Sequence, residues 1–238
     1  SKSMYIQDCV KAGGDNYIMV GTKAISSGGS KGVIVKVNSN GDTLWTKTLG
    51  GDGQNGLYAI DKTEDHHYVA IGTFEYETTG QDWFFMKFNS RGSVRARFHT
   101  GGGLAQRGFD ITALGDDEYL ITGMAAFVNG DMLAIKFDIN AANIEWVKRF
   151  GGGEFEDGVV GKSTQDGGYL IGGGTYSFSQ DPGETDDLFI VKTNAQGDSV
   201  WALTHGVAGR YDWANDWVQT NDGNFIICGL KDNNDPDG

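Results

Sequence analysis

The sequence repeats one pattern of about 50 residues almost five times. Each copy contains an aromatic residue followed by apolar residues and a glycine, as in YIMVGT at 17–22 and YLIGGG at 169–174. The aromatic anchors are 51, 51, 50 and 56 residues apart, and they are Tyr17, Tyr68, Tyr119, Tyr169 and Phe225. Self-similarity at this period is typical of propellers, solenoids and repeat arrays, because each unit buries its apolar surface against its neighbours.

The fourth copy shows most clearly what one repeat forms. The turn sequences QDGG (165–168) and AQGD (195–198) favour tight hairpins, since glycine and aspartate tolerate a positive φ. Around these turns lie four short runs of strand-forming residues, at 158–164, 169–175, 187–194 and 200–206. No segment shows sustained helical periodicity with caps. One repeat is therefore predicted to be a four-stranded antiparallel sheet.

The predicted sheets are apolar on both faces. In the third strand of the first repeat, Val33, Val35 and Val37 point to one side and Ile34 to the other. A sheet that must be covered on both faces, and that recurs in tandem, packs against copies of itself around an axis. We therefore predict an all-β fold, a β-propeller of four-stranded antiparallel blades. The alternative, a parallel β-helix, has shorter rungs and lacks alternating hairpin turns.

The two hairpins of the repeat occur in unequal numbers. We count five copies of the first hairpin and four of the second, and the last residues, KDNNDPDG (231–238), stand where the fifth loop should lead into a third strand. We therefore expect four complete sheets and an incomplete fifth, which residues outside this chain would complete. Residues 1–238 should form a single propeller domain or fragment, with repeats at about 1–51, 52–103, 104–153, 154–207 and, in part, 208–238.

Charge and composition exclude some classes of partner. The formal net charge is −13, so the phosphate backbone of a nucleic acid would be repelled. No apolar run approaches the roughly 20 residues that cross a bilayer, and the first residues lack the pattern of a signal peptide. Cys9 and Cys228 can form one long-range disulfide in an oxidising compartment or remain free thiols buried in strands.

The repeat also resembles a known type. It combines Asp-Gly-Gly-Tyr at 166–169, Asp followed by apolar residues and Lys at 187–192, and a tryptophan in the fourth strand. This pattern resembles repeats common in secreted and surface proteins of bacteria, which are generally taken to be β-propeller blades. The resemblance covers the whole chain. It implies the propeller fold and an extracellular or cell-surface location, and it points to no particular activity. The second repeat departs from it, because Arg95 replaces the tryptophan and EDHH (64–67) replaces the Asp-Gly-Gly turn.

No catalytic set stands out. His99 and His205 share a repeat position with Leu49 and Phe150, which is typical of a packing position at a strand end. No zinc spacing, phosphate-binding loop or nucleophile elbow is present. A pair of carboxylates on one face could act on a glycosidic bond, but nothing singles out which pair.

The recurring lysines and tryptophans are predicted to belong to the scaffold. We expect the lysines to pair with strand acids or to extend to the sheet edge: Lys36, Lys87, Lys136 and Lys192. The tryptophans of the fourth strands are expected at one repeated position, packed between neighbouring blades: Trp45, Trp146 and Trp201.

Loops after the second strand carry a large apolar residue in each of four repeats, and connectors between repeats emerge at the same end of the strands. We predict that this end forms a ligand-binding face with these residues: Tyr76, Phe127, Phe178, Arg107, Tyr211 and Trp213. The alternative is that each aromatic side chain folds inward and plugs its own loop.

Two loops are rich in oxygen ligands. NNDPDG (233–238) fits the start of a calcium loop, and the matching loop of the fourth repeat is also acidic. Calcium is therefore the one predicted cofactor, with these ligands: Asp235, Asp237, Asp181 and Asp186. Turn formation by aspartate and asparagine is the alternative explanation.

These observations favour a non-catalytic extracellular or surface module that binds a protein partner or a surface, within a longer chain or assembly. The alternative is a carbohydrate-binding or carbohydrate-active propeller. The two differ in that a lectin should show similar pockets between blades, whereas a hydrolase should show one cleft with two carboxylates.

Overall fold

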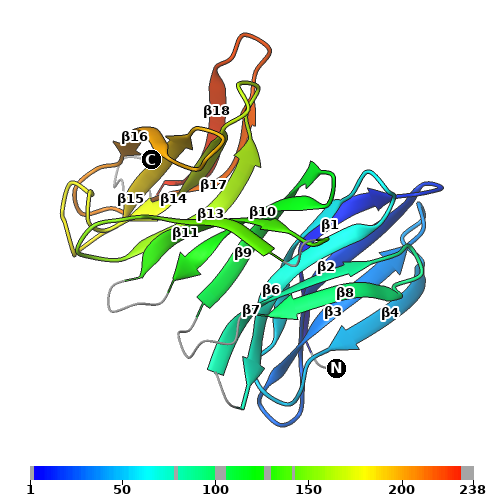
Figure 1. The fold of residues 1–238 in the computed structure, drawn as a ribbon. Helices are drawn as coiled ribbons and strands as arrows, with labels where there is room; N and C mark the ends of the chain where they lie inside the picture. The colour runs from blue at the N-terminus through cyan, green and yellow to red at the C-terminus, as the bar shows by residue number, and fades with distance from the viewer. Residues whose placement is uncertain (1–2, 78–79, 100–105, 126–129, 141–142, 232–238) are drawn as a thin grey trace. The chain divides into compact units, whose positions relative to one another are not determined.

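The computed structural model describes residues 3–77, 80–99, 106–125, 130–140 and 143–231. These residues form eighteen β-strands (Figure 1). The strands are β1 (Met4–Ala12), β2 (Asn16–Ala24), β3 (Ser30–Val37), β4 (Thr43–Leu49), β5 (Gly56–Lys62), β6 (Tyr68–Tyr76), β7 (Gly80–Phe88), β8 (Val94–His99), β9 (Gln106–Gly115), β10 (Glu118–Ala125), β11 (Asp131–Asp138), β12 (Asn143–Phe150), β13 (Glu156–Ser163), β14 (Tyr169–Thr175), β15 (Asp187–Thr193), β16 (Ser199–His205), β17 (Asp212–Gln219) and β18 (Phe225–Lys231). None of the described segments is a helix that could cross a membrane.

The strands form four four-stranded sheets and one two-stranded sheet. Their orders are β1-β2-β3-β4, β5-β6-β7-β8, β9-β10-β11-β12, β13-β14-β15-β16 and β17-β18. Pairing within the sheets is antiparallel, as in the hairpins that the repeats predict. The predicted fold is thus confirmed as an all-β propeller with four complete blades and an incomplete fifth among the described residues.

The chain divides into two compact units, which we describe separately. Unit 1 is Ser1–Tyr119 with Ile139–Ala141, and unit 2 is Leu120–Asp138 with Ala142–Gly238. The prediction of a single domain stays a prediction.

Each unit has a core between the faces of successive sheets. In unit 1, Ile18 and Ile34 of the first sheet pack against Leu57 and Met86 of the second, and all four side chains are buried. In unit 2, buried Leu170 faces Trp217. At about 25 cal/mol per Å² of apolar surface, these faces supply the main stabilisation.

The glycine of the YLIGGG-type strand has a steric cause. A bulge interrupts the first strand of the blade, between Leu57 and Ala59 in the second repeat and between Gly158 and Val160 in the fourth. There the backbone of the first strand lies against a glycine of the second. At Gly173 an added Cβ would stand 2.8 Å from the carbonyl carbon of Asp157 and closer still to its oxygen. Any other residue would push the two strands apart.

The outer-strand tryptophans lie as predicted. Trp45, Trp146 and Trp201 each pair with the lysine of the third strand. The ring of Trp146 lies 5.6 Å from that of Tyr169 in the next sheet, and that of Trp201 lies 6.3 Å from Phe225.

The alignment of Arg95 with these tryptophans was wrong. Lys87 pairs with Ala96 just as Lys36 pairs with Trp45, and the bulge that skips Arg95 skips Leu44, Glu145 and Val200 at the same place in the other sheets. Ala96 therefore occupies the tryptophan position of the second repeat.

Both cysteines are free. Cys9 in β1 and Cys228 in β18 are also exposed, so the expectation of buried thiols was wrong. Cys228 is exposed because its sheet has two strands among the described residues.

Candidate functional site

In unit 2 the loop between β14 and β15 meets the connector between β16 and β17 at one end of the strands. The amide of Asp212 donates a hydrogen bond of 2.9 Å to the carbonyl of Asp186. The Tyr211 hydroxyl lies 3.5 Å from the carbonyl oxygen of Glu184, to which it donates. We call the surface formed here by Tyr176, Asp186, Tyr211 and Trp213 the acidic–aromatic surface.

A buried carboxylate anchors the base of this loop. Glu156, at the start of β13, is fully buried. Its Oε1 accepts hydrogen bonds from the Thr175 hydroxyl at 2.8 Å and the Ser177 amide at 3.1 Å. Its Oε2 accepts from the Gly152 amide at 3.0 Å. The loop that carries Tyr176 is thereby tied to the end of the preceding sheet.

Gly174 leaves room for the side chains of the acidic–aromatic surface. A Cβ added to Gly174 would lie 3.0 Å from Asp186 Oδ2 and 3.5 Å from the Cβ of Trp213. Asp186 and Trp213 therefore flank the bare backbone of β14, while Tyr211 remains 40% exposed. The side chains of Asp186 and Trp213 thus lie near one another, and both are partly exposed.

The carboxylate of Asp186 in the acidic–aromatic surface is repelled by other carboxylates nearby. Burial raises the pKa of Asp186 to about 6, with a further contribution from the charges of Asp157, Asp187 and Asp212. Its Oδ1 is buried and accepts no hydrogen bond from the described residues. Burial, followed by the charge of Asp186, also raises the pKa of Tyr176. A positive charge placed here would be stabilised.

The predicted binding residues fall at several places. Tyr211 and Trp213 lie in the acidic–aromatic surface. Phe178 instead packs 5.5 Å from the ring of Phe189, remains 47% exposed and lines a groove of about 420 Å³ in unit 2. Tyr176 was missed, although it directly follows the strand-end threonine.

Two further predicted residues belong to unit 1, and one cannot be placed. Tyr76 is half-buried and stacks on His99, with ring centroids 4.3 Å apart. Arg107 is exposed, and its Nη2 donates to Gln81 Oε1 at 3.3 Å. Phe127 lies outside the described residues. The continuous face predicted from these residues therefore stays a prediction.

The calcium prediction is likewise untested. Asp235 and Asp237 lie outside the described residues, and Asp186 belongs to the acidic–aromatic surface. The backbone carbonyl of Asp181 accepts from the amide of Glu184 at 3.0 Å within a turn. Across the described ranges, no three His, Cys, Asp or Glu side chains are grouped so as to hold a metal ion.

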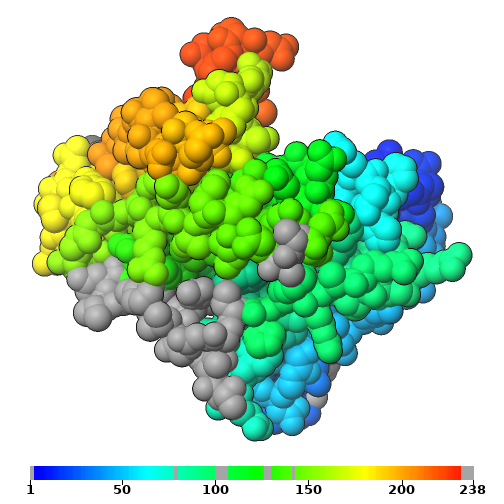
Figure 2. Space-filling model, viewed as in Figure 1, coloured from blue at the N-terminus to red at the C-terminus, as the bar shows by residue number. Residues whose placement is uncertain are grey.

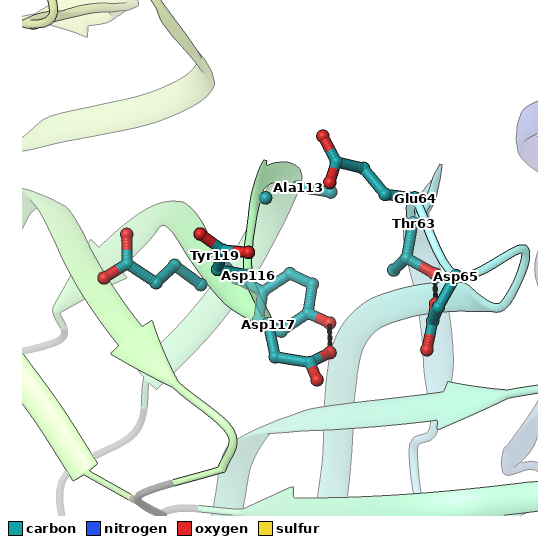
Figure 3. Close-up of a pocket in the computed structure, with 9 residues that line it drawn as sticks. Thr63, Glu64, Asp65, Ala113, Asp116, Asp117 and Tyr119 are labelled. Carbon is teal, nitrogen blue, oxygen red and sulfur yellow. Dashed lines mark hydrogen bonds between the residues drawn. The ribbon is translucent and has the colours of Figure 1, made fainter.

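Unit 1 contains a second candidate, an acid-lined pocket of about 230 Å³ (Figure 3). Two hairpin turns border it, one between β5 and β6 and one between β9 and β10. In Figure 3 Thr63 donates to Asp65 on the first turn, and Tyr119 donates to Asp117 on the second. Further acidic residues of the lining are Glu64, Asp116 and Glu118.

A lysine joins these two turns. Lys87 has only 8% of its side chain exposed, and its Nζ lies 2.8 Å from Asp65 Oδ2 and also binds Asp117. Burial works to raise the pKa of Asp65, but the hydrogen bonds from Lys87 and Thr63 hold it well below its ordinary value. The pKa of Asp117 is also lowered, because its bonds to Lys87 and Tyr119 outweigh its burial. Both carboxylates thus already have partners within the scaffold, although the single positive charge of Lys87 offsets only one of their two negative charges.

The fourth repeat contains the same arrangement. Lys192 Nζ lies 2.9 Å from Asp166 Oδ2, and Thr164 donates to Asp166 at 2.6 Å. We call this arrangement of a Thr-x-Asp turn and a third-strand lysine the lysine clasp. Its recurrence identifies Lys87 as part of the scaffold. The prediction that the repeated lysines pair with acidic residues of strands is confirmed for Lys136, which lies 2.9 Å from Glu145 of β12. Lys87 and Lys192 pair instead with aspartates of hairpin turns.

No protein-family model and no curated protein matches the sequence. Among solved structures, the chain is similar to a neuraminidase-like protein from A/bat/Guatemala/164/2009, with a TM-score of 0.56 and 7% identity over 86% of this chain and 59% of that one. It is similar to the N10 neuraminidase-like protein of A/little yellow-shouldered bat/Guatemala/060/2010, with a TM-score of 0.53 and 8% identity over 98% and 80%. The β-propeller domain of the Trilobed protease from Pyrococcus furiosus matches with a TM-score of 0.49 and 11% identity over 97% and 65%. The chain thus spans less than two thirds of the first and third of these proteins. At such identities the likeness concerns the fold alone.

Proposed function

We propose that this chain is a non-catalytic binding module whose acidic–aromatic surface takes a basic segment of a protein partner. The observation that carries the proposal is the Asp186 carboxylate, which is only partly buried, lies near Trp213 across Gly174 and stands among the charges of Asp157, Asp187 and Asp212. A lysine or arginine side chain can interact with both groups, because its positive charge is attracted to the carboxylate and to the face of an aromatic ring.

The physical argument has two parts. A cation over an aromatic face gains about 0.5–2 kcal/mol, depending on how far the site is desolvated. A guanidinium or ammonium group also brings positive charge and hydrogen-bond donors to the Asp186 carboxylate, and it offsets the mutual repulsion of the neighbouring carboxylates. The net charge of −13 adds long-range attraction for a basic partner.

The proposed setting is the cell surface or the extracellular space, within a larger chain or assembly. It is supported by the resemblance of the repeats to those of secreted and surface proteins of bacteria. The competing ligand is a glycan, since the ring of Tyr211 could also stack on a sugar.

A peptide titration tests the proposal. The probe is the amidated hexapeptide Gly-Arg-Lys-Gly-Arg-Lys with a fluorophore on its N-terminus, followed by fluorescence anisotropy, with an equally labelled Gly-Glu-Asp repeat as the negative control. We expect the affinity for this peptide to decrease as the salt concentration rises, and to be about fivefold lower in the Tyr211→Ala and Asp186→Asn variants.

Matched controls come from unit 1. Tyr17 is 41% exposed, almost as Tyr211 is, so Tyr17→Ala should leave binding unchanged. Asp42→Asn, at an exposed turn, should do the same. Equal losses in Tyr17→Ala and Tyr211→Ala would refute the site. Binding of maltoheptaose that depends on Tyr211, without binding of the basic peptide, would favour the carbohydrate alternative.

A further inference from the structure

The groove of about 420 Å³ beside Phe178 lies between the end of β12 and the sheet of β13 to β16, all within unit 2. Its floor is apolar, because Phe189 and Val191 of β15 are buried there. Residues of β16 complete the lining, and in Figure 2 the orange atoms of this strand lie at the surface. A space of this size is typical of sites for small molecules.

The second repeat shows what fills the equivalent place in unit 1. His99 of β8 stands opposite Phe84, which comes three residues before the third-strand lysine. Thr204 of β16 stands opposite Phe189, which comes three residues before the lysine of its own strand. The register therefore makes Thr204 the counterpart of His99, and the sequence-based alignment of His99 with His205 was wrong by one residue.

In unit 1 the chain places a ring of its own at this position. The imidazole of His99 stacks on Tyr76, with ring centroids 4.3 Å apart and an interplanar angle of 21°. Tyr76 is the counterpart of Phe178, because each comes three residues after a strand-end threonine. Arg97 lies two residues before His99 and so projects to the same face of β8. A planar ring and a cation thus stand beside the loop aromatic residue of the second repeat.

The fourth repeat has small residues at both of these positions. Ala202 and Thr204 stand where the second repeat has its arginine and its histidine. Phe178 is inclined at 46° to the ring of Phe189 and remains 47% exposed. Since a threonine supplies no ring, the stacking position that is filled beside Tyr76 is open beside Phe178.

The groove also has a distinct charge. Among the described residues that line it, Arg149 of β12 is the one that carries a charge, and none is acidic. The first repeat has Thr48 at the position of Arg149. In a chain with a net charge of −13, a lining with one arginine and no acid favours an anionic group locally.

We propose that this groove binds a small planar aromatic carboxylate, independently of the acidic–aromatic surface. The ring of the ligand stacks on Phe178 as the imidazole of His99 stacks on Tyr76. Its carboxylate pairs with the guanidinium of Arg149. Thr204 determines specificity, because its side chain is small enough to leave the stacking position open.

Cinnamate, a planar ring with a conjugated carboxylate, serves as the probe. It is titrated into the isotopically labelled whole chain, and the amide shifts of Phe178 and Thr204 give the dissociation constant by NMR. We expect a value of about 1 mM, which is usual for a ligand of this size. Thr204→His should weaken binding by about tenfold, because it adds the ring that fills this position in the second repeat. The matched control, Thr204→Val, keeps the side chain small and should bind within about twofold of the parent.

Two analogues separate stacking from charge. Cyclohexylpropionate has the charge and the non-hydrogen atom count of cinnamate but a puckered ring, so it should bind about fivefold more weakly. Cinnamamide keeps the planar ring without the charge and should also bind about fivefold more weakly. In Arg149→Gln, cinnamate and cinnamamide should bind equally.

Several results would overturn the proposal. One is undiminished cinnamate binding in Thr204→His with the thermal unfolding of the parent, and another is equal binding of cinnamate and cyclohexylpropionate. A preference for cinnamate over cinnamamide that persisted in Arg149→Gln would show that the carboxylate is bound elsewhere. Shifts confined to Tyr211 and Trp213 would place the probe on the acidic–aromatic surface, and an absence of shifts up to about 10 mM would exclude a site for this class of ligand.

Discussion

Replacing Gly173 by alanine should destabilise unit 2 by about 3 kcal/mol. The added Cβ would stand 2.8 Å from the carbonyl carbon of Asp157, where ordinary contact needs about 3.5 Å, and it would lie closer still to the carbonyl oxygen, so the strands must part by more than about 0.7 Å. Parting them weakens the ladder bonds around the pair of Gly158 and Gly173, at about 1 kcal/mol each. Overpacking adds about 1–3 kcal/mol.

Chemical denaturation followed by circular dichroism and tryptophan fluorescence measures this loss. Gly153→Ala is the matched control in the same unit, because no atom lies within 4 Å of its added Cβ. That variant should change the free energy of unfolding by less than about 0.5 kcal/mol. If Gly173→Ala also stayed within 1 kcal/mol of the parent, the steric explanation of the repeated glycine would be refuted.

Three further outcomes follow from the packing and charge of single residues. Asp186→Asn should stabilise the fold at pH 7 by about 1 kcal/mol, a value discounted because Asp186 is only partly buried. Since the folded pKa of about 6 lies above the ordinary 3.8, the cost of the charge grows as the pH rises from about 4 to 6 and is complete above pH 6. The gain should therefore disappear below about pH 4, and a gain that persisted undiminished there would contradict this explanation. His66 has a φ of 61°, and the matching turns carry Gly167 and Gly223 at this position. His66→Gly should therefore raise the free energy of unfolding by about 0.5–1 kcal/mol in thermal denaturation. A lower free energy of unfolding would show that the imidazole stabilises the turn. Trp146→Ala should cost about 2 kcal/mol and leave binding of the basic peptide unchanged, because its half-buried ring packs on Tyr169; lost binding with unchanged unfolding would reverse that assignment.

The sequence predicts the blades well because their signals are local. YLIGGGT and DLFIVKT reveal strands by their own residues, and QDGG reveals a hairpin. The bulge beside the third-strand lysine was not predictable in this way, since it depends on the register between two strands. The alignment of Arg95 was wrong for a simpler reason, because Ala96 and not Arg95 stands 51 residues after Trp45. The glycine of YLIGGG was recognisable as a pattern, but its cause lies in the backbone of another strand.

The candidate sites were predicted less completely, because they join residues that are distant in sequence. Tyr211 and Trp213 were expected on the binding face, yet only the fold shows that Asp186 stands beside Trp213. The pocket between the turns of Asp65 and Asp117 was missed for the same reason. Its only local signal was the unusual EDHH turn, and the lysine that bridges it is common to the repeat.

The location of the basic peptide on the folded chain tests the central claim most directly. We propose a two-dimensional NMR titration of the isotopically labelled chain with the Gly-Arg-Lys hexapeptide. The indole N–H of Trp213 and the amides of Tyr211 and Asp186 should shift, while the indole of Trp217, which is 3% exposed in the same strand, should stay in place. Shifts centred instead on Glu64 and Asp116, at the pocket of Figure 3, would contradict the account.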